Sequence, residues 1–259
     1  MFIKLTFMSL SSPGGINRSF SNSACLQAKK INEGPSEGLV KTTHKETGNQ
    51  FNEAQHLKMQ LTNEQMQVGV GVMLGDGSIT KSSNGSTLSL AQGTVHTSYF
   101  LFVFGLLFDL CKKFPNMYST WDVRYHHYNY QWKFYTVSLS CLNKLYSLFY
   151  DEQGKRRIHP GLIVYLTPIA LAHWIINDGE KLVRGGLFLN TFSFSMEEVD
   201  RLISIIKTNF SLDCHRIIKR SKGKVYWRIY ISGKRENLNK LIDLVLPHMH
   251  SSMYYKLGL

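Results

Sequence analysis

The sequence predicts a mixed α/β (α+β) protein of two pseudo-symmetric halves, each with the element order αββαββα. Three observations support this prediction. An order of helical and alternating segments runs from about residue 63 to the end of the chain and occurs twice. Each copy opens with a helix of small and apolar residues that ends in an Asp-Gly pair, at Asp76 and at Asp178. Each copy also contains strands in which polar and apolar residues alternate, as in antiparallel sheets with one solvated face.

Residues 1–62 predict a flexible N-terminal extension. Ser, Asn, Gly and Gln are abundant there, and apolar periodicity is absent. Residues 1–30 contain no Asp or Glu but include Lys4, Arg18, Lys29 and Lys30, a composition that resembles an organelle transit peptide. A disordered tail, or a remnant of an upstream reading frame, explains the same composition equally well.

Residues 63–152 form the first predicted repeat. Its elements are a helix at 64–75, strands at 78–83 and 86–96, an apolar helix at 98–114, strands at 118–128 and 130–139, and a closing helix at 142–150. The most apolar run, residues 99–111, carries Asp109 and is shorter than the roughly 20 residues that a membrane span needs. We therefore expect a buried helix there and no membrane anchor.

Residues 153–165 form a predicted basic linker around Lys155, Arg156 and Arg157, and residues 166–259 form the second repeat. Its first helix begins at Pro168 after the capping residue Thr167. The further elements are a strand at 186–194, a helix opened by a capping box at 195–198, strands at 214–220 and 224–232, and a helix at 236–248.

The composition points to an anionic partner. Thirty Lys and Arg residues against 18 Asp and Glu residues give a net charge of +12, which a nucleic acid or an acidic membrane surface would offset. The hydrophobic share of 43% is enough for a core without disulfides. The four cysteines contain no CxxC pair, and no Cys/His cluster has zinc-ligand spacing.

The acids at the ends of the two opening helices are chemically unusual. The carboxyl end of a helix carries partial negative charge, so a carboxylate at that place is disfavoured unless a positive charge compensates it. A metal ion is the obvious candidate. A single such Asp would be interpreted as a solvated helix-end acid, but two equivalent ones, Asp76 and Asp178, favour a metal site.

Here the chain resembles the LAGLIDADG homing endonucleases, and above all the single-chain, two-motif enzymes encoded by mitochondrial group I introns. The resemblance covers roughly residues 63–259 and rests on the motifs at 69–77 and 171–179, on Leu166-Thr167-Pro168, Asn190-Thr191, Phe194 and Glu197-Glu198-Val199, and on the run 253–257. Two motifs with matching downstream patterns are far more specific than one.

The resemblance implies a site-specific endonuclease that cuts both strands of double-stranded DNA across the minor groove. It implies that the two motif helices pack side by side and that Asp76 and Asp178 bind Mg²⁺, with Gly75 and Asn177 beside them as further metal contacts. It also implies a mitochondrial or other organellar location, and a monomer that binds a long asymmetric site.

Basic residues beside the metal are a further implication. Lys256 matches the second-half lysine of the family, while in the first half Arg156 and Lys155 compete for the equivalent role. The alternative is that the linker cations are solvated and contact only the DNA backbone.

Two strand pairs predict a DNA-binding surface. Lys224, Tyr226, Arg228 and Tyr230 alternate with Val225, Trp227, Ile229 and Ile231, so one face is core and the other offers cations and hydrogen-bonding aromatics. Lys133 and Tyr135 repeat the pattern in the first half, opposed by Trp132 and Phe134, and Lys219 lies on a neighbouring strand. The alternative is an ordinary solvated sheet.

Another function compatible with the sequence is that of an intron maturase, which binds intron RNA on the same fold and assists splicing. Maturases often lose one motif acid, whereas both persist here. A DNA-binding regulator without cleavage is a third interpretation. A histidine-based metal site at His126, His127 or His96 is less favoured, because no ligand spacing accompanies these residues.

Overall fold

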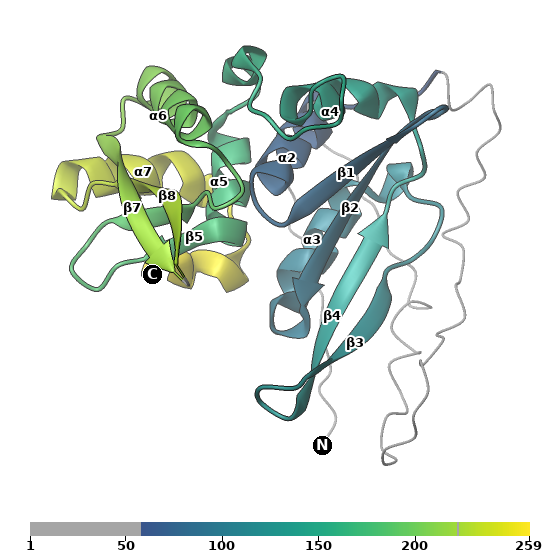
Figure 1. The fold of residues 1–259 in the computed structure, drawn as a ribbon, viewed down its shortest axis with the longest axis horizontal. Helices are drawn as coiled ribbons and strands as arrows, with labels where there is room; N and C mark the ends of the chain where they lie inside the picture. Colours follow the sequence, from purple (N-terminus) through teal and green to yellow (C-terminus); the bar gives the residue numbers. More distant parts are fainter. Residues whose placement is uncertain (1–57, 222) are drawn as a thin grey trace. The chain divides into compact units, whose positions relative to one another are not determined.

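The computed structural model describes residues 58–221 and 223–259 (Figure 1). Two four-stranded antiparallel sheets with helices packed on them make up this part of the chain, which confirms the predicted α+β fold with two sheets. Residues 1–57, which hold most of the predicted N-terminal extension and all of its transit-like segment, lie outside the described residues.

Both sheets have the same strand order. The first contains β1 (Gly77–Ser82), β2 (Gly85–Gly93), β3 (Asn116–Asp122) and β4 (His127–Tyr135) in the order β1-β2-β4-β3. The second contains β5 (Gly179–Lys181), β6 (Leu187–Asn190), β7 (Cys214–Ser221) and β8 (Lys224–Ile231) in the order β5-β6-β8-β7. The repeat in the sequence is therefore a repeat in topology.

Three α-helices accompany each sheet: α2 (Asn63–Leu74), α3 (Thr97–Leu106) and α4 (Asn143–Phe149), then α5 (Pro168–Asp178), α6 (Met196–Phe210) and α7 (Arg235–Val245). The side chains of Thr62, Thr167 and Ser195 cap α2, α5 and α6 by accepting hydrogen bonds from backbone N–H groups. The predicted capping box of α6 is present, with Glu198 bonded back to Ser195. A 3-10 turn, η5 (Pro160–Val164), lies in the predicted linker.

Two predicted boundaries are wrong, and one strand was missed. The helix expected over 98–114 ends at Leu106, since the Leu107 N–H is shared among three carbonyls and the following 3-10 turn presents the Leu110 carbonyl to the Val137 N–H. The turn between β3 and β4 lies at 123–126 rather than near residue 129, and His126 adopts a left-handed conformation there. The short strand β5 was not predicted, because three residues are too few for alternation to show.

The two halves meet where α2 packs against α5. A Cβ built on Gly71 would lie 2.6 Å from the Cβ of His173 and even closer to the Ala170 carbonyl, and one built on Gly75 would overlap the Cβ of Asn177. Only glycine permits so close an approach of two helix backbones at these positions. The spacing of four residues places Gly71 and the capping residue Gly75 on the same side of α2, the side that faces α5.

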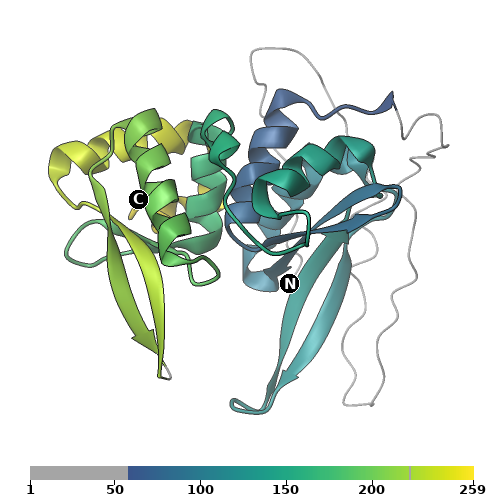
Figure 2. The same cartoon turned by 45° about the horizontal axis from the view of Figure 1, so that its top comes forward.

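The predicted alternation of the strands is confirmed near the helices and fails beyond them. Phe134, Ile229 and Ile231 are buried under the helices, as expected. Val225, predicted on the core face, is 52% exposed, because the β7–β8 hairpin extends past the helices of its own half (Figure 2). The apolar run at 99–111 forms α3 and its following turn, and no helix among the described residues has the length and apolarity to cross a membrane.

We predict that Gly71→Ala lowers the free energy of unfolding by about 1–3 kcal/mol, because the added methyl group must push α5 away from α2. Chemical denaturation would measure the change. Gly93→Ala is the control, since its Cβ would meet only Val95 at 3.8 Å and the backbone conformation there suits any residue. Equal stability of the two variants would contradict the close packing.

Candidate active site

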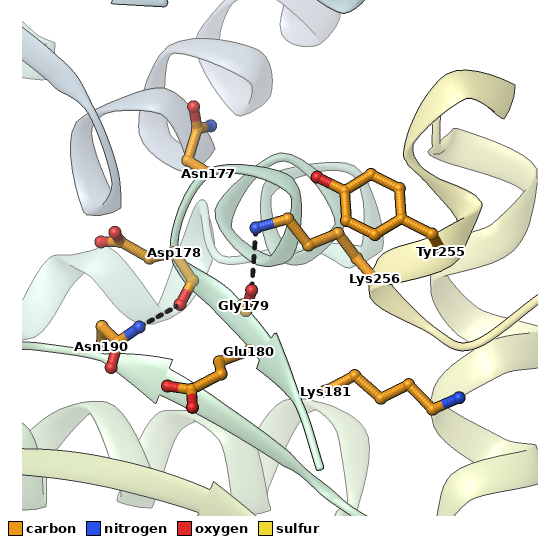
Figure 3. Close-up of a pocket in the computed structure, with 8 residues that line it drawn as sticks. All are labelled: Asn177, Asp178, Gly179, Glu180, Lys181, Asn190, Tyr255 and Lys256. Carbon is orange, nitrogen blue, oxygen red and sulfur yellow. Dashed lines mark hydrogen bonds between the residues drawn. The ribbon is translucent and has the colours of Figure 1, made fainter. Parts of the chain in front are cut away.

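The two motif acids lie at the carboxyl ends of α2 and α5. Asp76 follows Gly75, the C-cap of α2, and Asp178 is the last residue of α5. Asp178 borders a cavity of about 410 Å³, whose lining residues are Asn177, Asp178, Gly179, Glu180, Lys181, Asn190, Tyr255 and Lys256 (Figure 3). Since α2 and α5 run side by side, their ends bring the two acids to one place.

Burial acts on both carboxylates, and the charge of Asp76 acts on Asp178. Burial and the negative charge of Asp76 raise the pKa of Asp178 to about 7, against the opposing effect of Lys256 and Arg156. Asp76 keeps an exposed edge, but the protein around its other sides raises its pKa by desolvation, while a hydrogen bond from Gln92 and the Lys256 charge act in the lowering direction. Two acids that resist simultaneous ionisation form a site that favours a cation.

Gln92 connects the two halves at this site. Its Nε2 donates to Asp76 Oδ2 at 2.7 Å and to Asn177 Oδ1 at 2.7 Å. Gln92 is not among the predicted site residues, although the sequence carries a signal for it. Leu88 and Leu90 occupy the core face of β2, so the alternation calls for an apolar residue at position 92, where a buried glutamine stands instead.

One cation lies at the carboxyl end of each motif helix. The Lys256 Nζ donates to the carbonyl oxygen of Gly179 at 2.9 Å, and its charge acts on both Asp178 and Asp76. Burial lowers the pKa of Lys256, and the neighbouring carboxylates act in the opposite direction. Lys256 belongs to the 3-10 segment η7 (Ser251–Lys256), which places Tyr255 on the rim of the same cavity (Figure 3).

Arg156 is the counterpart at α2. Its Nη2 donates to the Met73 carbonyl at 2.8 Å, its guanidinium lies 4.7 Å from the centre of the Phe194 ring, and its charge lowers the pKa of Asp178. Lys155 is exposed, and its backbone N–H bonds to Asp151. The geometry therefore favours Arg156 over Lys155 as the first-half cation at the acids.

Gly75 and Asn177, predicted beside the metal, have little to offer from their side chains. Gly75 has none, and both polar atoms of the Asn177 amide already have partners, Oδ1 with Gln92 and Nδ2 with Tyr99. Each can still offer a backbone carbonyl oxygen. Within residues 58–221 and 223–259, no group of three or more His, Cys, Asp or Glu residues is arranged to hold a metal ion.

The predicted DNA-binding residues share one face of each sheet, but they differ in accessibility. Lys219 and Lys224 are exposed, Tyr226 is half-buried against Phe192, and in the first sheet Lys133 lies 4.9 Å from the ring centre of the exposed Tyr135. The Tyr230 hydroxyl accepts a hydrogen bond from the Gly233 N–H. Of the predicted DNA-binding residues on β7 and β8, Lys219 and Lys224 are therefore the cations whose side chains are exposed to solvent.

Arg228 corrects the expectation of a solvent-facing cation on β8. It lies on the predicted face but is only 7% exposed. Its guanidinium forms an ion pair with Glu180 at 2.9 Å and packs 3.9 Å from the centre of the Phe188 ring. Both partners come from the other strands of the same sheet, Glu180 from β5 and Phe188 from β6. Their side chains cover Arg228 on the outer face, where alternation alone predicts exposure.

The raised pKa of Asp178 predicts a pH-dependent loss of stability in the metal-free protein. Its folded value of about 7 exceeds the ordinary 3.8, so the unfolded chain ionises first as pH rises. A protonated Asp178 adds no penalty to folding below about pH 4. As pH rises from about 4 to about 7, the folded protein loses free energy of unfolding, because the unfolded chain releases this proton more readily. In EDTA, Asp178→Asn should therefore raise the free energy of unfolding at pH 8, by at most about 4 kcal/mol, and change it little at pH 4. Urea titrations at both pH values would measure this, with the exposed Asp243→Asn as control; a gain independent of pH would refute it.

Comparison with known proteins places this geometry in a family. The sequence model described as "LAGLIDADG DNA endonuclease family" matches residues 66–240. The intron-encoded endonuclease ai4 of Dictyostelium discoideum is 34% identical over 129 residues, which are 50% of this chain and 78% of that protein. The cytochrome b mRNA maturase bI2 of Saccharomyces cerevisiae is 30% identical over 197 residues, 73% of this chain and 46% of that protein.

A solved structure shows the same fold. The homing endonuclease I-WcaI, bound to its DNA recognition sequence, superposes with a TM-score of 0.68 at 26% identity, over 77% of this chain and 88% of that one. The matched family model spans most of α2, all of α5, both acids and every strand of both sheets. The chain belongs to the LAGLIDADG DNA endonuclease family.

Proposed function

We propose that this protein is a site-specific homing endonuclease that cuts both strands of double-stranded DNA across the minor groove. The observation that carries the proposal is the convergence of Asp76 and Asp178 from equivalent ends of two helices, with Lys256 and Arg156 beside them. One acid from each half suits a reaction that must occur once on each strand. The similarity to I-WcaI, which binds a DNA recognition sequence, supports the same substrate class.

The residues present fit a divalent cation, and we propose Mg²⁺. Burial, and after it the charge of Asp76, raises the pKa of Asp178, and a cation bound between the two carboxylates would offset both effects. Mg²⁺ is commonly held by one or two carboxylates while it keeps several waters and contacts substrate phosphate, so a sparse ligand set suits it. When bound, such an ion supplies Lewis-acid stabilisation and an activated water for phosphodiester hydrolysis.

The remaining polar residues have proposed roles in positioning and charge. Lys256 and Arg156 place positive charge where a scissile phosphate would gain negative charge, and their bonds to helix-end carbonyls fix them there. Gln92 holds the Asp76 carboxylate from behind. Lys133, Tyr135, Lys219, Lys224 and Tyr226 face outward on the sheets, which we propose bind DNA in the major groove.

A maturase function is the second candidate, because two of the similar proteins are cytochrome b mRNA maturases, from Saccharomyces cerevisiae and Debaryomyces hansenii. Binding of intron RNA could accompany DNA cleavage. The close pair of acids is a feature that splicing support does not need, so it favours the nuclease. Promotion of group I intron splicing by a protein that does not cut DNA would reverse this preference.

We further propose that the protein acts as a monomer in a mitochondrion or another organelle. One chain already carries two sheets and both acids, so a second copy is not needed to complete the site. The intron-encoded relatives and the transit-like composition of residues 1–30 support the organelle.

Asp178→Asn is expected to lower double-strand cutting in Mg²⁺ by at least about 100-fold, because charge stabilisation by a catalytic metal is worth several kcal/mol. Duplex binding in Ca²⁺ should be largely unchanged, since the variant keeps the shape of the side chain and removes no DNA contact. Cleavage of a library of duplexes followed by sequencing of the cut ends would first identify the site. The exposed helix acid Asp243→Asn is the matched control. Undiminished cutting by the Asp178→Asn protein would remove the metal role.

Lys219→Ala and Lys224→Ala are each expected to weaken duplex binding and to reduce the slope of log affinity against log salt by about 1, if each lysine neutralises one phosphate. Both side chains are exposed on the outward hairpin of the second sheet. The comparison is Lys207→Ala, an exposed lysine at the end of α6, the helix packed on the covered side of that sheet. Titration at several salt concentrations measures the slopes. Identical slopes for all three variants would argue against this surface.

A further inference from the structure

A chain of polar side chains runs from Asp76 into the core between the two halves. The Gln92 Nε2 bridges Asp76 and Asn177, the Asn177 Nδ2 donates to the Tyr99 hydroxyl at 3.1 Å, and that hydroxyl lies 2.9 Å from His173 Nδ1. Tyr99 and His173 are almost wholly buried. We call these four residues behind Asp76 the relay.

The relay has one consistent direction of hydrogen bonding. The Tyr99 oxygen accepts from Asn177, and among the described residues His173 Nδ1 is the one acceptor within reach of the Tyr99 proton. This direction satisfies the buried hydroxyl and makes Nδ1 the unprotonated nitrogen of a neutral ring. The Asn177 Nδ2 also donates to the His173 carbonyl at 2.6 Å, so the Asn177 oxygen is turned toward Gln92. A flipped Asn177 amide would place its Nδ2 donor against the Gln92 Nε2 donor and its oxygen against the His173 carbonyl oxygen. The hydrogen bonds of the relay therefore fix the amide orientation of both Asn177 and Gln92.

The relay belongs to one acid only. Among the described residues, no hydrogen bond is recorded to the Asp178 carboxylate, whereas Asp76 is tied through Gln92. The side chains of His173 and Asn177 fit against α2 because Gly71 and Gly75 have no side chains there.

Simple packing does not explain Tyr99 and His173. Burying a hydroxyl and an imidazole costs free energy that a phenylalanine in either place would not incur. Tyr99 comes from α3 in the first half, and His173 from α5 in the second. A polar contact held at this cost, and leading without a break to a motif acid, indicates a positioning role.

We propose that Tyr99 and His173 are positioning residues that orient the Asp76 carboxylate through Asn177 and Gln92, and that they serve one of the two strand cuts more than the other. This inference rests on the proposed function. Loss of the Tyr99 hydroxyl removes one of the two acceptors of the Asn177 Nδ2 and leaves only the His173 carbonyl. The Asn177 side chain is then held less firmly, and through it so are Gln92 and the Asp76 carboxylate. Misplacement of a reacting group by about 1 Å can slow a reaction about 100-fold.

The first test compares the two strands. With a duplex labelled differently on each strand, single-turnover cutting by Tyr99→Phe in Mg²⁺ should show one strand slowed by about 10- to 100-fold relative to the other, with nicked DNA accumulating. Binding in Ca²⁺ should be unchanged. Tyr146→Phe is the matched control, a half-buried helix tyrosine outside the relay, and should leave both rates unchanged. Equal rates of the two strands in the Tyr99→Phe protein, slowed together or not at all, would overturn the proposal.

A second test needs no cutting, so it separates this inference from the proposed function. In metal-free protein, the side-chain amide NMR signals of Gln92, identified by their loss in Gln92→Glu, should shift in Tyr99→Phe and in His173→Phe but not in Tyr146→Phe. The double variant Tyr99→Phe/His173→Phe should resemble Tyr99→Phe alone, because both act through one path. Unmoved Gln92 signals would refute the relay even if the protein cuts DNA. Moved signals in a protein that cuts no duplex would uphold the relay and refute the nuclease.

Discussion

The close packing of α2 on α5 is the constraint on which the rest of the site depends. At Gly71 and Gly75 no side chain separates the two helix backbones, so the carboxyl ends of both helices reach the same place. Asp76 and Asp178 meet there because of where the helices end, not through any loop that could adjust. A site on two packed helices is also better fixed than one on mobile connections.

This arrangement opposes ordinary electrostatics. Two acids sit at the negative ends of two helices, partly removed from water, and the charge of Asp76 disfavours ionisation of Asp178. The fold offsets some of this with one cation per helix end, Arg156 on the Met73 carbonyl and Lys256 on the Gly179 carbonyl. The offset is incomplete, since the pKa of Asp178 remains near 7. An unfavourable local arrangement kept by an otherwise well-packed fold is expected where function requires it.

The sequence predicts the large features because they follow from local patterns. Repetition and periodicity predict both sheets and the motif helices, and the capping residues predict where α5 and α6 begin. Features that depend on tertiary contacts are missed. Arg228 occupies an outward position on β8, but only the fold shows that Glu180 and Phe188 cover it. The choice between Lys155 and Arg156 likewise needs the path of the linker past α2.

The two halves repeat in topology but differ in what surrounds each acid. The registers of β1 with β2 and of β5 with β6 make Gln92 equivalent to Thr191, yet the Thr191 hydroxyl bonds to the Trp227 carbonyl within its own sheet and reaches no acid. The two motifs also differ at the helix contact, where glycines of the first motif face larger polar residues on α5. A duplicated fold in one chain can accept such differences because each half mutates alone, whereas a symmetric dimer must carry every change twice. The unequal surroundings of Asp76 and Asp178 follow from that freedom, and they give the two acids different tolerance to change in the residues behind them.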